Sequence, residues 1–98
     1  MSARPKPPSE IPADDDLRAV LAYRIRTLRV EKGWSQERLA FECRLDRTYV
    51  SAVERSRWNI SLSNIGRIAQ ALEVAPWMLL KPVWSSEAVA GSEPSLGS

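Results

Sequence analysis

The sequence contains no histidine, and Cys43 is its only cysteine. Without histidine the chain lacks a common zinc ligand and the most frequent general acid-base group. A single thiol cannot form an intramolecular disulfide, and we expect Cys43 on a buried helix face with no histidine to activate it. These absences predict no metal site, no cofactor and no enzymatic activity.

Long apolar runs are also missing. No stretch approaches the roughly 18 residues of a membrane-spanning helix, and the first ten residues, MSARPKPPSE, lack the apolar segment of a signal peptide. With 44% hydrophobic and 27% charged residues, the 98-residue chain has the composition of a single globular domain. We expect a soluble, cytoplasmic protein that does not contact a membrane.

Composition and charge divide the chain into three parts. Four of the seven prolines lie in residues 1–12, and residues 85–98 are mostly serine, alanine, glycine and glutamate. We predict a disordered N-terminal arm at 1–16, a folded domain at 17–82 and a flexible C-terminal tail at 83–98. Residues 17–81 carry twelve Lys and Arg against six Asp and Glu, a net charge of +6, although the whole chain carries +2. Such an arginine-rich domain favours nucleic acid as its partner.

Apolar residues recur at spacings of three and four, which predicts helices, and no two-residue alternation indicates a strand. Ser35, Asp46 and Ser61 are suited to cap helices, while Pro76 suits the first turn of a short one. We therefore predict an all-α fold, a compact bundle of five helices. They are expected at residues 16–32, 35–43, 46–55, 61–72 and 76–80.

Three strings of the sequence, in this order, resemble the helix-turn-helix DNA-binding domain of the phage repressor and Cro family. The family's first two helices are similar to LAYRIRTLRVEKGWSQERLA, its recognition helix to DRTYVSAVER, and its closing helices to IAQALEV followed by PWMLL. The resemblance extends from Leu21 to Leu80 and implies a lambda-repressor-like fold. Within the family, the residues from Leu45 to Tyr49 resemble the controller proteins of restriction-modification systems.

The third helix is the one expected to read DNA bases. A recognition helix enters the major groove with its first residues against base edges, where arginine can donate two hydrogen bonds to guanine. Val50 and Val53 are expected to face inward, which leaves the opposite surface available. Base contacts are predicted for Arg47, Thr48, Ser51 and Ala52.

Other residues are expected to position the protein on the DNA backbone. The resemblance implies that Gln36 binds a phosphate at a helix N-terminus, and that Arg29 and Glu54 form an ion pair between the first and third helices. Tyr49 could meet a phosphate or pack beside Val53, and we expect Trp58 to be a packing anchor. The predicted backbone contacts are Gln36, Arg44, Tyr49, Arg55, Ser56, Arg57 and Asn59.

Arg44 stands where the family often has glycine in its turn. A left-handed backbone there would carry strain, or else the turn takes a different shape.

The C-terminal part of the domain has more apolar surface than one short helix can bury. This predicts a homodimer interface, although the two tryptophans could instead close the core of the monomer. The expected interface residues are Pro76, Trp77, Met78, Leu79, Val83 and Trp84.

These observations predict a transcriptional regulator that binds double-stranded DNA at an inverted-repeat operator as a homodimer, with no small-molecule substrate. A second hypothesis is an antitoxin-like protein-interaction module in which DNA binding is secondary.

Overall fold

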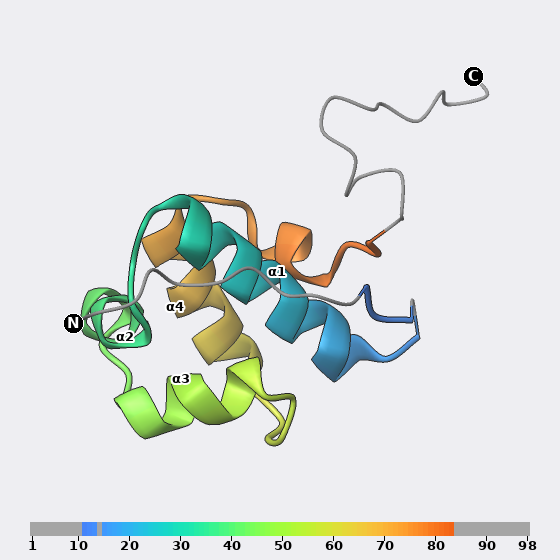
Figure 1. The fold of residues 1–98 in the computed structure, drawn as a ribbon, viewed down its shortest axis with the longest axis horizontal. Coiled ribbons are helices and arrows are strands. Elements are labelled where there is room, and N and C mark those ends of the chain that lie inside the picture. Colours follow the sequence, from blue (N-terminus) through green and yellow to red (C-terminus); the bar gives the residue numbers. More distant parts are fainter. Residues whose placement is uncertain (1–10, 14, 84–98) are drawn as a thin grey trace.

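The computed structural model describes residues 11–13 and 15–83, which are shown in colour in Figure 1. The described residues form no strand, so the predicted all-α class is confirmed. None of their helices is long and apolar enough to cross a membrane. The elements are α1 (Leu17–Glu31), α2 (Gln36–Cys43), α3 (Arg47–Glu54), α4 (Leu62–Leu72) and the 3-10 helix η1 (Pro76–Leu80).

The predicted bundle of five helices is found in part: among the described residues four elements are α-helices and the fifth is a 3-10 helix. The Met78 N–H donates to the Ala75 carbonyl at 3.0 Å, which is the tighter i to i+3 pattern. Pro82 biases the residue before it away from helical geometry, and Lys81 is extended, with φ −69° and ψ 130°. The segment is therefore too short for an α-helical ladder. The predicted terminal regions lie largely outside the described residues.

A side-chain oxygen caps each of the four α-helices. Ser35 Oγ accepts a hydrogen bond from the Arg38 N–H at 3.0 Å, and an Asp46 carboxylate oxygen accepts one from the Thr48 N–H at 2.8 Å. Asp16 and Ser61 do the same for α1 and α4, each at 3.1 Å. These caps satisfy backbone donors that have no partner inside the helix.

The core lies where the helices meet. Ile25 of α1, Leu39 of α2, Ile68 of α4 and Leu79 of η1 are fully buried, and Val50 of α3 is 1% exposed. Every element therefore contributes a side chain to one apolar cluster, whose burial is the main stabilising term of a small domain. In Figure 1, α1 crosses the middle of the molecule and α3 lies along its lower edge.

Arg24 fastens the segment after η1 to α1. Its Nε donates to the Lys81 carbonyl at 3.0 Å, and its Nη2 donates to the Pro82 carbonyl at 2.7 Å. Val83, the next residue, is only 4% exposed. This part of the chain therefore packs back on the domain.

Candidate nucleic-acid interface

The first turn of α3 presents polar side chains to solvent. Arg47 and Thr48 are exposed and Ser51 is half-buried, whereas Val50 and Val53 on the opposite side are 1% and 2% exposed. The valines fix the helix on the core, so its first residues are held in one orientation. Arginine and threonine at these positions have the donors, the acceptor and the methyl group that base edges can recognise.

Ala52 does not share this surface, and its predicted base contact is wrong. The residue is 3% exposed. Its carbonyl accepts hydrogen bonds from the N–H groups of Arg55 and Arg57, at 3.2 and 3.0 Å, because the chain turns back after α3. The methyl group of Ala52 is therefore covered by protein and faces away from solvent.

Arg29 and Glu54 form a bidentate ion pair that joins α1 to the end of α3. Arg29 Nε lies 2.7 Å from Glu54 Oε2, and its Nη2 donates to Oε1 at 2.9 Å. The two side chains are 6% and 2% exposed. The third nitrogen, Nη1, donates to the Trp34 carbonyl at 2.8 Å. Such a paired and satisfied cluster holds the end of α3 firmly against α1.

Gln36 is connected to the same cluster. This first residue of α2 is half-buried, and its Nε2 donates to Glu54 Oε1 at 3.0 Å. A side-chain amide has two N–H donors, so this bond leaves one for another acceptor. The N-terminus of α2 and the amide of Gln36 together suit a phosphate oxygen.

The turn between α2 and α3 contains Arg44 in the left-handed conformation, with φ 59° and ψ 43°. Of the two shapes expected, the strained one is found. For a residue with a Cβ this conformation costs about 1–2 kcal/mol. The Arg44 N–H donates to the Phe41 carbonyl at 3.3 Å, and the Leu45 N–H donates to the Ala40 carbonyl at 2.9 Å. These bonds hold the sharp change of direction between the two helices, while Arg44 itself is exposed.

The loop after α3 presents further polar groups. Arg55, Arg57 and Asn59 are exposed, while Ser56 is half-buried with φ 60°. The Ser56 hydroxyl donates to the Arg18 carbonyl at 3.4 Å, which holds the start of the loop against α1.

Tyr49 and Trp58 lie together at this loop. Their ring centroids are 5.7 Å apart, and the Tyr49 hydroxyl accepts a hydrogen bond from Asn64 Nδ2 at 3.1 Å. Tyr49 is partly buried against the core, so packing holds its ring, while its hydroxyl can still donate. Trp58 is 48% exposed. The expected packing is found against Tyr49, while about half of the residue stays exposed.

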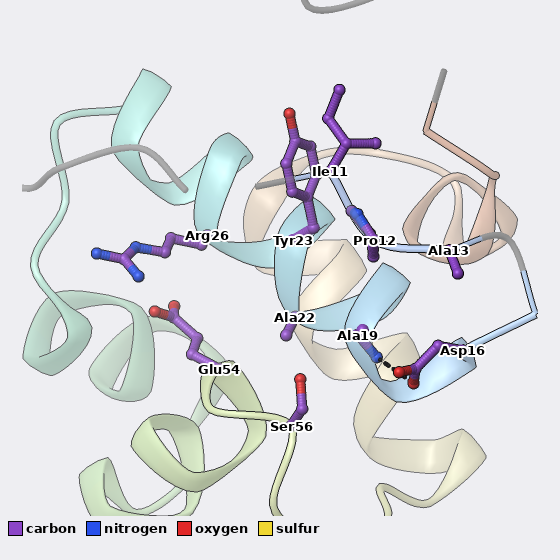
Figure 2. Close-up of a pocket in the computed structure, with 10 residues that line it drawn as sticks. All are labelled: Ile11, Pro12, Ala13, Asp16, Ala19, Ala22, Tyr23, Arg26, Glu54 and Ser56. Carbon is purple, nitrogen blue, oxygen red and sulfur yellow. Dashed lines mark hydrogen bonds between the residues drawn. The ribbon is translucent and has the colours of Figure 1, made fainter. Parts of the chain in front are cut away.

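A cavity of about 460 Å³ separates the chain before α1 from α1 itself. Figure 2 shows Ile11 beside the ring of Tyr23, with Ser56 at the opposite side of the hollow. The described residues contain no group of three or more ligands suited to a metal ion. We assign no ligand to this cavity, which is lined by Ile11, Pro12, Ala13, Asp16, Ala19, Ala22, Tyr23, Arg26, Glu54 and Ser56.

The structure divides the residues expected at a dimer interface. Pro76 is exposed, Trp77 is 64% exposed and Met78 is half-buried. Leu79 and Val83 are 0% and 4% exposed, so their predicted interface contacts are wrong. Both are buried in the monomer because η1 packs on the core and Arg24 holds the following segment. Trp84 lies outside the described residues, and the exposure of Trp77 excludes it as a closure of the core.

A short helix that presents its first residues, joined by a tight turn to a supporting helix, defines a helix-turn-helix protein. Residues 25–76, which are more than half of the chain, match the helix-turn-helix family, and the chain belongs to it.

Three relatives illustrate this kinship. The chain is 63% identical to a hypothetical transcription factor, NHTF, from Neisseria, with a TM-score of 0.79 over 81% of this chain and 89% of the other. It is 46% identical over 67 residues to the control protein C.BamHI of Bacillus amyloliquefaciens, covering 67% of this chain and 83% of that protein.

The third relative is the restriction-modification controller protein C.Esp1396I, solved as a tetramer in complex with its natural 35 base-pair operator. It is 36% identical, with a TM-score of 0.60 over 64% of this chain and 83% of the other. The expected resemblance to controller proteins is thus confirmed.

Proposed function

We propose that this protein is a transcriptional regulator that recognises an inverted-repeat operator as a homodimer. The exposed first turn of α3 carries the proposal, since Arg47 and Thr48 stand on a helix anchored by buried Val50 and Val53. Arginine can bind guanine O6 and N7 together, which discriminates between bases by about 1–3 kcal/mol. Ser51, which is half-buried, is a further candidate for a base contact.

The surrounding polar groups position the protein without reading sequence. Four arginines on α3 and its flanking turns, Arg44, Arg47, Arg55 and Arg57, are exposed, which supports attraction to phosphates. We assign backbone contacts to Gln36, Arg44, Tyr49, Arg55, Ser56, Arg57 and Asn59. Contacts of this kind fix the register of a protein on DNA.

Dimerisation doubles the few base pairs that one short helix can read. Trp77 supports it, because this residue is 64% exposed and its neighbours Pro76 and Met78 extend the apolar surface that a second copy could cover. We place the interface at Pro76, Trp77 and Met78. A two-fold dimer would then set its half-sites about one helical turn apart, roughly 34 Å.

No catalytic step is part of this proposal. Burial raises the pKa of the Cys43 thiol, and Cys43 is 3% exposed, so the thiolate that a nucleophile needs is disfavoured. We further propose that the protein acts in the cytoplasm.

Selection from a library of random duplexes at near-physiological salt tests the proposal. Enrichment of an inverted repeat is expected, and the sequence of that repeat would be the operator. Retained DNA without a common sequence would contradict specific recognition. A folded protein that retains no DNA at all would contradict the whole proposal and favour a protein-interaction module.

A further inference from the structure

Trp58 has a large exposed surface that the fold itself does not explain. The indole is 48% exposed, and its neighbours Arg57 and Asn59 are exposed polar residues. Single exposed apolar residues are ordinary on protein surfaces, and Phe41 is more exposed than Trp58, so a partner has to be argued from the position of the residue. The position of Trp58 identifies that partner.

The indole is held in place before any partner arrives. The Tyr49 ring lies 5.7 Å from it, centroid to centroid, at an interplanar angle of 51°, and Asn64 holds the Tyr49 hydroxyl. Ser56 secures the start of the loop through its hydrogen bond to the Arg18 carbonyl. Binding a partner would therefore cost little conformational entropy at Trp58, which favours affinity.

The loop containing Trp58 adjoins the recognition helix. Tyr49, its ring partner, lies in α3 two residues after Arg47, and Figure 1 shows the loop beside the end of α3 along the lower edge of the molecule. Arg55 and Arg57 are exposed in the same stretch and attract a negatively charged partner. We propose that Trp58 packs against the sugar-phosphate backbone of DNA bound at α3.

The chemistry of indole suits this contact. Its flat apolar face can cover a deoxyribose, and its Nε1–H can only donate, as to a phosphate oxygen. Sugar and phosphate are the same at every nucleotide, so the contact contributes affinity and not base preference. An uncharged ring displaces no counterion, which separates its effect from that of a neighbouring arginine. This inference rests on the proposed function.

The test compares three variants of the full chain on the selected operator and on a random duplex, at several salt concentrations. Trp58→Ala is expected to weaken binding to both duplexes by roughly tenfold, with an unchanged slope of affinity against salt. Arg57→Ala is expected to weaken both and to reduce that slope by about one. Phe41→Ala is the matched control: Phe41 is a 78% exposed aromatic residue that lies roughly 140° around α2 from Gln36, and its loss should change neither.

Trp58→Phe is included in case the alanine variant does not fold, which circular dichroism would detect. Phenylalanine keeps a ring beside Tyr49 but has no N–H, so about threefold weaker binding is expected. Wild-type affinity in both Trp58 variants would overturn the inference, as would a Trp58→Ala protein that loses only its self-association. A wild-type protein that binds neither duplex would instead overturn the proposed function.

Discussion

At the scale of the residue, strain is stored at the turn between α2 and α3. Arg44 adopts φ 59°, a conformation that costs a residue with a Cβ about 1–2 kcal/mol. Arg44→Gly should therefore be more stable than Arg44→Ala by about 0.5–1 kcal/mol, after allowance for the greater entropy of unfolded glycine. Urea unfolding of the two variants measures the difference. Both lack the guanidinium, so equal midpoints would mean that the turn relaxes without cost.

The ion pair between α1 and α3 is a second feature of single residues. Arg29 and Glu54 are almost fully buried, and removing one partner leaves the other charge unpaired. Glu54→Ala should lower the free energy of unfolding by about 3–5 kcal/mol.

Glu73→Gln is the control, because Glu73 is 77% exposed beside Lys32. The hydrogen bond from Lys32 lowers the pKa of Glu73, so this pair stabilises the fold at neutral pH and ceases to do so as the pH falls through that lowered pKa. Its screened contribution should be small. Equal losses in the two variants at pH 7 would contradict the structural role assigned to Glu54.

At the scale of the element, local signals in the sequence suffice for the α-helices. Ser35, Asp46 and Ser61 each precede a helix as predicted, because a cap acts within three residues of itself. The 3-10 geometry of η1 could not be predicted in the same way, because a five-residue segment is too short to show a helical period in its apolar residues.

Contacts between segments far apart in the chain could not be predicted from local patterns in the sequence. Ala52 is buried although it was expected on the exposed face of α3, and about half of Trp58 stays exposed. Arg24 donates to the carbonyls of Lys81 and Pro82, which lie 57 and 58 positions further along the chain. A spacing of three or four between apolar residues cannot predict such a contact. The exposed first turn of α3 could therefore be predicted from the sequence, whereas the burial of Ala52 and the exposure of Trp58 could not.

The division of labour along α3 and the following loop leads to a contrast between two arginines. Arg47→Ala should lower affinity for the operator and relax base preference at one position in each half-site, because the proposed role of its guanidinium is to read a base. Arg57→Ala should weaken binding to all duplexes alike. Repeating the library selection with each variant distinguishes them. Identical selected sequences from the wild type and the Arg47 variant would exclude Arg47 as a base reader.

At the scale of the whole molecule, self-association should depend on Trp77. An exposed tryptophan at an interface is a frequent energetic centre, so Trp77→Ala should raise the dissociation constant of the dimer by at least about tenfold. Analytical ultracentrifugation across a range of concentrations measures it. The monomer fold should be retained, since Trp77 is 64% exposed. An unchanged dimer would place the interface elsewhere.

Arg24 contacts the segment after η1 through main-chain atoms. Its two acceptors in the segment after η1 are main-chain carbonyls, those of Lys81 and Pro82, and every residue has a carbonyl. Substitutions at positions 81 and 82 can therefore keep these two hydrogen bonds wherever the extended backbone is kept. Arg24→Lys cannot, because an ammonium lacks the planar fork that reaches two carbonyls together. Position 24 therefore restricts the type of residue more tightly than positions 81 and 82 do.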